Sequence, residues 1–207
     1  MKIITIAAGP VNTNAYILYD ESTLNGVLID PGAEADKITD EIDKAGIKIV
    51  AILVTHGHFD HIGAVDELRE RLGVPAYASQ KEADLAADVN LNCSTALRRE
   101  IVCKIDKIIE ENEILDFDFV KIDTIFTPGH THGHNCFYLA TENVLFSGDC
   151  LFKNSYGRYD LPTSNFEQLK ASLFKLFELP NETKVYPGHG TPTEISYEKN
   201  NNPILKS

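Results

Sequence analysis

Four side chains able to bind a metal ion lie within six residues, directly after a run rich in Ile and Val. They form the pattern His56-x-His58-x-Asp60-His61. The run at 48–54 has the length and β-branched composition of a buried strand. Imidazole nitrogens and carboxylate oxygens are ligands that zinc-like ions prefer. The segment therefore predicts a covered sheet whose strand end presents a metal-binding loop to solvent.

One loop cannot complete a metal site, because each ion needs three or more protein ligands. We expect His56 and His58 to point to one side of the loop, and Asp60 and His61 to the other. Further ligands then have to come from other strand ends. The candidates are His130 in Thr-Pro-Gly-His-Thr, Asp149 in Ser-Gly-Asp and His189 in Pro-Gly-His-Gly. All seven histidines of the chain lie at 56–61, at 130–134 or at 189, which favours a shared role over incidental placement.

The chain alternates strands and helices throughout, which is typical of the α/β class. No repeat, linker or low-complexity tract divides it, so we expect a single domain over 1–207. Helices are expected at 35–45, 62–72, 81–87 and 166–179, and strands at 2–7, 15–19, 27–29, 48–54, 74–78, 120–126, 136–140, 144–146 and 185–186. The stretch 90–112 has no periodicity that assigns it to either.

Charge, cysteine content and the length of the apolar runs restrict the classes of partner and the location that we expect. Asp and Glu number 31 against 19 Lys and Arg, which gives a net charge of −12. Such a surface repels phosphate backbones, so we expect a small-molecule substrate and no nucleic acid. The four cysteines form no CxxC pair, which argues against a thiolate zinc site. No apolar run spans a bilayer and the first strand is too short for a signal peptide. We therefore expect a cytoplasmic protein without a membrane partner; the oligomeric state stays open.

These motifs resemble those of the metallo-β-lactamase superfamily, in the same order and over nearly the whole chain. The matching segments are Thr55-His56-Gly57-His58-Phe59-Asp60-His61, Thr127-Pro128-Gly129-His130-Thr131, Ser147-Gly148-Asp149 and Pro187-Gly188-His189-Gly190. Gly157-Arg158-Tyr159-Asp160 and Glu198-Lys199-Asn200-Asn201-Asn202-Pro203 are similar to segments of its hydroxyacylglutathione hydrolase (glyoxalase II)-like branch, here in a short form. The resemblance implies an αββα four-layer sandwich, with two mixed sheets face to face, helices outside and metals at one edge.

The resemblance also implies which residues bind two divalent metal ions. His56, His58 and His130 would bind the first ion, Asp60, His61 and His189 the second, and Asp149 would bridge both. Zinc is the expected metal, with iron or manganese as alternatives. His134 resembles a hydrogen-bonding residue beside the ligands rather than a ligand.

Two metal ions that share a water molecule lower its pKa towards neutrality, which supplies a metal-bound hydroxide for hydrolysis. Asp60 would orient that hydroxide. A thioester of the S-2-hydroxyacyl-glutathione type suits this chemistry, because a thiolate leaves readily. Arg158 is a candidate for binding a substrate carboxylate, and an internal ion pair with Asp160 is the alternative interpretation.

Other reactions remain open. Persulfide dioxygenases resemble the same branch and bind one iron through two histidines and an aspartate, here His56, His130 and Asp149. A lactonase is a third option, since the same hydroxide attacks a ring ester. Longer members of the branch bind glutathione through a basic C-terminal helical domain, whereas 18 residues follow His189 here. The acidic charge disfavours RNA processing, and a complete two-metal site disfavours a non-catalytic role.

Overall fold

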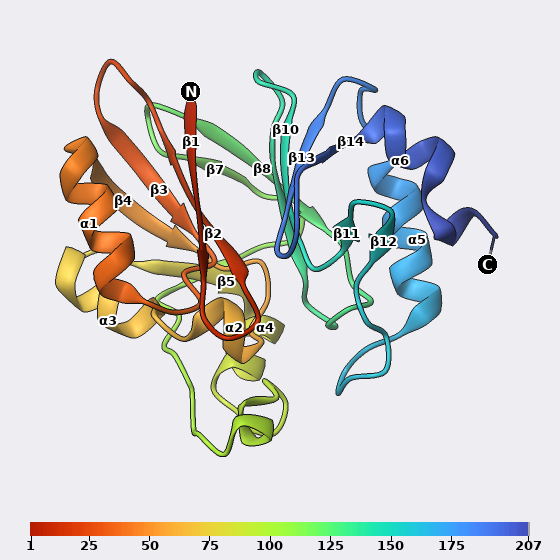
Figure 1. The fold of residues 1–207 in the computed structure, drawn as a ribbon, viewed down its shortest axis with the longest axis horizontal. Coiled ribbons are helices and arrows are strands. Elements are labelled where there is room, and N and C mark those ends of the chain that lie inside the picture. The colour runs from red at the N-terminus through yellow and green to blue at the C-terminus, as the bar shows by residue number, and fades with distance from the viewer. Residues whose placement is uncertain (207) are drawn as a thin grey trace.

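Two six-stranded sheets lie face to face in the computed structural model, which describes residues 1–206. Helices α1 and α3 cover the outer face of the first sheet, on the left of Figure 1, and α5 and α6 cover the second sheet, on the right. The four layers confirm the αββα sandwich expected from the sequence motifs.

The first sheet has the order β1-β2-β3-β4-β5-β6. Its first three strands pair antiparallel, and β3 to β6 pair parallel. The strands are β1 (Lys2–Ala8), β2 (Thr13–Tyr19), β3 (Asn25–Ile29), β4 (Lys48–Leu53), β5 (Ala76–Ser79) and β6 (Lys107–Ile109).

The second sheet has the order β14-β13-β10-β9-β8-β7, and β10 and β13 form its parallel pair. A separate hairpin of β11 and β12 follows β10. The strands are β7 (Ile114–Asp116), β8 (Lys121–Phe126), β9 (Asn135–Leu139), β10 (Val144–Gly148), β11 (Leu151–Phe152), β12 (Ser155–Tyr156), β13 (Lys184–Pro187) and β14 (Thr193–Glu194).

The helices connect these strands. They are α1 (Ala35–Ala45), α2 (Phe59–Ile62), α3 (Val65–Leu72), α4 (Gln80–Ala86), α5 (Phe166–Leu176) and α6 (Ile195–Asn201), with short 3-10 helices η1 (Ser94–Leu97) and η2 (Pro203–Lys206). Within residues 1–206, no helix combines the length and the apolar character needed to cross a membrane.

Strand alternation builds the core between the sheets. In β2, Tyr16 and Leu18 face the second sheet, whereas Ala15 and Ile17 face the helices outside the first. This period of two is what a strand covered on both faces requires. Phe137 and Phe146 meet the first sheet from the other side and are fully or nearly fully buried. The buried sheets give a rigid support to the loops at their ends.

The helix expected over 62–72 is instead two helices, α2 and α3, separated at Gly63 and Ala64. A Cβ at Gly63 would lie 2.3 Å from the carbonyl oxygen of Gly32, and Ala64 donates its N–H to the carbonyl of Pro31 at 3.0 Å. The loop after β3 therefore docks into the gap. Helical periodicity could not reveal this contact, because it joins segments about thirty residues apart in sequence.

The unassigned stretch 90–112 contains η1 and the edge strand β6. A single fully buried side chain holds much of it: Asn92 donates to the carbonyls of Ile101 at 2.7 Å and Ala86 at 3.3 Å. Hydrogen bonds of this kind leave no periodic pattern in the sequence. The stretch could therefore not be predicted as helix or strand.

Candidate metal centre

Four strand ends meet at one edge of the sandwich. The loops after β4, β8, β10 and β13 carry the metal-binding candidates, and β4 belongs to the first sheet while the others belong to the second (Figure 1). Asn135 at the start of β9 donates its N–H to the carbonyl of Thr55 at 3.0 Å, and Asn14 donates to the carbonyl of Gly188 at 2.7 Å. These bonds tie the loops of the two sheets together.

The structure brings all seven expected side chains into one cluster. Their ligand atoms form three overlapping groups, within each of which the atoms lie no more than 4.8 Å apart. The groups are His56, His58 and His130; His56, His61 and Asp149; and Asp60, His61 and His189. No residue expected at the site falls outside this cluster apart from Arg158, which lies at its mouth.

Asp149 lies between the two outer groups. Its Oδ1 is 3.3 Å from Nε2 of His61, and its Oδ2 is 3.6 Å from Nε2 of both His130 and His189. Asp60 completes the second group, with Oδ2 3.1 Å from Nε2 of His189. The carboxylate of Asp149 thus lies close to histidines of both outer groups.

Several polar atoms in the cluster are buried without a hydrogen-bond partner. They are Nε2 of His56, His58 and His61, and Oδ1 of Asp149. Leaving a buried polar atom unpaired costs about 1–3 kcal/mol, so such atoms rarely occur together without a ligand. In addition, Nδ1 of His58 lies 3.0 Å from Nε2 of His130. The donor set fits divalent metal ions, because each residue of a group offers one ligand atom within 4.8 Å of the others.

The opposite ring nitrogens are held by the protein. Nδ1 of His130 lies 2.8 Å from the carbonyl oxygen of Arg158, and Nδ1 of His61 lies 2.9 Å from Oδ2 of Asp30. An Nδ1–H that donates to an oxygen leaves Nε2 unprotonated and free to bind a metal. These contacts select the tautomer that a metal ligand needs.

Charges in the cluster shift one another's pKa values. Burial alone would raise the pKa of Asp60, but His61 and His189 lower it to about 2. Burial alone would lower the pKa of His61, but Asp149, Asp60 and Asp30 raise it well above its ordinary value. In the first group, burial and then His130 lower the pKa of His58 to about 3. The first group therefore offers neutral imidazoles, and an ion entering the second displaces a proton.

The family model for the metallo-beta-lactamase superfamily matches residues 8–189, a range that includes every residue of the cluster. The chain belongs to the metallo-beta-lactamase superfamily. Within it, the chain is 40% identical to YqgX, a probable metallo-hydrolase of Bacillus subtilis, over 99% of this chain and 98% of that protein. It is 32% identical to the hydroxyacylglutathione hydrolase GloC of Haemophilus influenzae, over 100% and 99%. The expected family, one of metallo-hydrolases, is thus confirmed.

Solved structures agree with this membership. BLEG-1, a B3 metallo-beta-lactamase, has a TM-score of 0.95 at 38% identity and covers 100% of both chains. TTHA1623 in a di-iron-bound form has a TM-score of 0.88 at 38% identity, over 98% of this chain and 100% of that one. ETHE1 from Myxococcus xanthus has a TM-score of 0.83 at 29% identity, over 98% and 84%. A relative that binds iron leaves the metal of this superfamily member open.

Two carboxylates that were not predicted from the sequence support the cluster. Asp30, at the end of β3, contacts His61 and also accepts the N–H and hydroxyl of Thr55 at 2.7 and 2.6 Å. Glu82, on α4, is buried against the loops of the first group. Asp30 stands in the turn sequence Asp-Pro-Gly, and Glu82 lies within the helix expected over 81–87. Their position after strand ends, next to no histidine, gave no signal of this role.

His134 lies within the superfamily site but both of its ring nitrogens are occupied. Its Nδ1 is 2.9 Å from the hydroxyl of Thr127, and its Nε2 accepts the backbone N–H of Asp149 at 3.2 Å. Its ring thus supports the backbone that carries Asp149 instead of facing the ligand atoms of the cluster.

A pocket of about 600 Å³ opens onto the cluster. Its walls are mostly apolar, and His58, Asp60, His130, Asp149 and His189 form its floor. Arg158 lines its edge, where its guanidinium makes two hydrogen bonds of 2.9 Å to the carboxylate of Asp160. The pocket is large enough for a small-molecule substrate.

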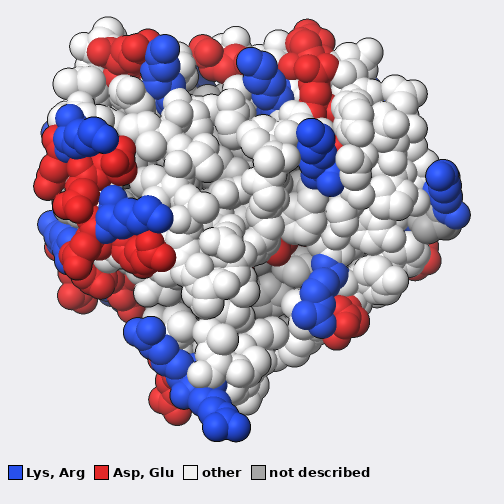
Figure 2. Space-filling view, viewed as in Figure 1, with Lys and Arg blue, Asp and Glu red and all other residues white. Residues whose placement is uncertain are grey.

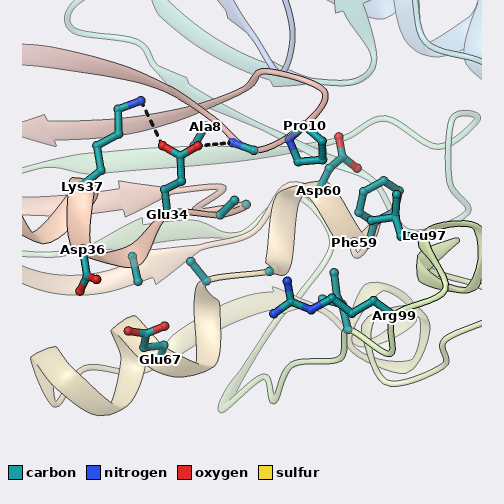
Figure 3. Close-up of a pocket in the computed structure, with 17 residues that line it drawn as sticks. Ala8, Pro10, Glu34, Asp36, Lys37, Phe59, Asp60, Glu67, Leu97 and Arg99 are labelled. Atoms are coloured by element: carbon teal, nitrogen blue, oxygen red, sulfur yellow. Dashed lines mark hydrogen bonds and ion pairs between the residues drawn. The ribbon is translucent and has the colours of Figure 1, made fainter.

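A second pocket, of about 550 Å³, lies on another side of Phe59 and Asp60 (Figure 3). Glu34 in its wall is bound by Lys37 at 3.2 Å and by the N–H of Gly9 at 3.0 Å. Among the described residues, no histidine lines it. The histidines His58, His130 and His189 line the first pocket instead.

Proposed function

We propose that this chain is a hydrolase that uses two divalent metal ions to cleave thioesters of the S-2-hydroxyacyl-glutathione type. The observation that carries this proposal is the position of Asp149 between two groups of ligand atoms. The likeness to GloC, whose name states that it hydrolyses hydroxyacylglutathione, supports the substrate class. Zinc is the proposed metal, and the di-iron form of TTHA1623 makes iron the alternative.

The ligand groups divide between the two ions. His56, His58 and His130 would hold the first, Asp60, His61 and His189 the second, and Asp149 would bridge them. Bound there, the ions supply Lewis acidity, which makes water a stronger nucleophile and polarises a substrate carbonyl.

The protein's own groups prepare the attack. Oδ2 of Asp60 accepts the hydroxyl of Thr13 at 2.8 Å and lies 3.1 Å from Nε2 of His189, the neighbouring residue of the second group. Oδ1 of Asp60 is then available to orient the attacking water. The apolar pocket walls, including Phe152 and Leu161, exclude bulk water from the reacting carbonyl. The side chain of Arg158 at the pocket edge would bind a carboxylate of the substrate.

The surface supports a small-molecule substrate rather than a nucleic acid. On the face shown in Figure 2, charged side chains gather on the left, over α1 and α3, and the centre is largely uncharged. There Arg71 pairs with Asp36 at 2.9 Å, so part of the basic charge is neutralised. With a net charge of −12, the chain offers little to a phosphate backbone. We propose accordingly a single cytoplasmic domain without nucleic-acid or membrane partners.

A substrate panel tests the proposal. The purified protein is assayed on S-lactoylglutathione, a simple lactone and a β-lactam, alongside Asp149→Ala. We expect thioester hydrolysis by the wild type and its loss, together with metal loading, in Asp149→Ala. Asp84→Ala, which removes an exposed carboxylate from α4, is the control and should keep full activity. Full activity in Asp149→Ala would refute the site.

A persulfide dioxygenase is the second candidate, and the likeness to ETHE1 favours it. In that reaction His56, His130 and Asp149 would bind a single iron. Oxygen uptake with glutathione persulfide separates the two functions. Oxygen consumption by the iron-loaded protein, without thioester hydrolysis, would establish this second candidate.

A further inference from the structure

Glu82 is a fully buried carboxylate that touches the loops of the first ligand group without belonging to it. Its Oε2 accepts the N–H of Gly57 at 2.7 Å. Its Oε1 accepts the hydroxyl of Thr131 at 2.7 Å and the N–H of Gly133 at 2.8 Å. One side chain on α4 therefore joins a loop that follows β4, in the first sheet, to a loop that follows β8, in the second.

Two of the three donors lie next to histidines of the first group. Gly57 stands between His56 and His58, and Thr131 follows His130. The distance between the two loops is thus set by the width of one carboxylate. That distance also determines how closely Nδ1 of His58 approaches Nε2 of His130, which is 3.0 Å here.

The first turn of α4 directs Glu82 towards these loops. Ser79 and Glu82 have the spacing of a capping box, in which the carboxylate would turn back to the Ser79 backbone. Only half of that box forms: the hydroxyl of Ser79 accepts the N–H of Glu82 at 3.3 Å, and donates to the carbonyl of Gly133 at 2.8 Å. The carboxylate points instead to Gly57, Thr131 and Gly133.

Close packing makes this contact rigid. A Cβ at Gly57 would lie 2.8 Å from the backbone nitrogen of Ala86, and a Cβ at Gly133 would lie 2.6 Å from Cβ of Lys81. Both loops therefore touch α4 through glycine backbone. A change at Glu82 cannot be absorbed by moving the helix closer to either loop.

We propose that Glu82 is a positioning residue that holds the His56–His58 loop and the His130 loop at the separation needed to bind the first metal ion. This inference rests on the proposed metal site. Glu82 contacts neither the substrate nor the ligand atoms, so it acts through the two loops. Loss of its carboxylate should weaken the first ion much more than the second.

The test is Co²⁺ binding to metal-free protein, followed by the absorption bands of the bound ion. A His189→Ala background removes a nitrogen of the second group, so that titration reports on the first. Glu82→Gln keeps the size of the side chain. Its NH₂ group is a donor, however, and would face an N–H or hydroxyl that is also a donor. Changes to such outer partners typically cost 10- to 100-fold in metal affinity, and we expect about tenfold or more here.

Glu198→Gln is the matched control. Glu198 is also fully buried and accepts hydrogen bonds from Thr193 at 2.6 Å, Asn202 at 2.8 Å and the N–H of Asn154 at 3.1 Å, none of which lies in a loop of the first ligand group. Its substitution should leave Co²⁺ affinity within about twofold of the wild type. Should Glu82→Gln fail to fold, Thr131→Val removes one of the three donors, and Thr131→Ser should restore the affinity that Thr131→Val loses.

Unchanged Co²⁺ affinity and spectrum in both Glu82→Gln and Thr131→Val would overturn the inference. An equal loss of affinity in Glu82→Gln and Glu198→Gln would overturn it too, because it would point to general destabilisation. Failure of the unmodified protein to bind Co²⁺ would instead refute the proposed metal site, so the two failures are distinguishable.

Discussion

Asp30 and His61 form a contact that joins a strand end to a metal-binding side chain. Asp30 follows β3 with φ of 49°, an uncommon conformation that turns its carboxylate towards Thr55 and His61. It accepts from groups 25 and 31 positions later in the chain. Sequence motifs located the side chains that form the cluster, because they follow strands in recognisable turns. They could not locate Asp30, whose role depends on a neighbouring strand.

Asp30→Asn should lower the affinity of the second ion. The amide keeps the shape of the side chain, but its NH₂ group is a donor and cannot replace Oδ2, which accepts from Thr55 and His61. The tautomer of His61 is then no longer selected, and we expect about a tenfold loss in affinity, measured by competition with a chromophoric chelator. The control is Asp106→Asn. Asp106 accepts the N–H of Ala76 at 3.1 Å and lies away from the site. Equal affinities in the two variants would contradict this role.

Arg158→Ala separates substrate binding from structure. The ion pair between Arg158 and Asp160 is exposed, and exposed pairs add little to stability. The variant should melt at the wild-type temperature. If Arg158 binds a substrate carboxylate, KM rises while kcat stays close to its wild-type value. An unchanged KM for S-lactoylglutathione would show that the guanidinium of Arg158 pairs with Asp160 and does not bind the substrate.

At the scale of elements, α5 shows what periodicity can predict. Its apolar positions predicted an amphipathic helix from 166, and α5 begins there and packs Leu169, Leu173 and Leu176 on the second sheet. By contrast, the break between α2 and α3 depends on the backbone of Gly32, and the two-residue strands β11 and β12 are too short for a pattern. Local patterns predict long elements, and tertiary contacts decide the short ones.

Two neighbouring residues of α5 provide a matched test of that packing. Leu173 is fully buried, whereas Phe174 is 44% exposed. Leu173→Ala should lower the free energy of unfolding by about 2–5 kcal/mol through lost burial and a residual cavity. Phe174→Ala should change it by about 0.5 kcal/mol or less. Denaturant unfolding measures both, and a larger effect at Phe174 would contradict the orientation of the helix.

At the scale of the molecule, the cluster of His and Asp side chains joins the two sheets. Ligands from both sheets converge on it, so metal ions bound there hold the sandwich closed at that edge. The fold class and the strand-end placement of the ligands followed from the sequence, since both depend on buried strands and their order. The pocket walls and the pairing of Arg158 did not, because they depend on side-chain orientation.

Removal of the metal should therefore destabilise the whole molecule. Free metal at about 100 times its Kd adds about 2.7 kcal/mol to folding. For a domain of this size that corresponds to a fall of roughly 5–11 °C in Tm on treatment with a chelator. Asp149→Ala, which has lost the bridging carboxylate, should show a much smaller chelator effect. If the Tm of the wild type stays the same with and without the chelator, the result would argue against bound metal.

The most direct test of the two-metal hydrolase is metal quantification on the purified, active protein together with an oxygen electrode. We expect two ions per chain, with hydrolysis of S-lactoylglutathione that proceeds equally well without oxygen. One iron per chain, with oxygen consumed in proportion to glutathione persulfide and no thioester hydrolysis, would contradict it.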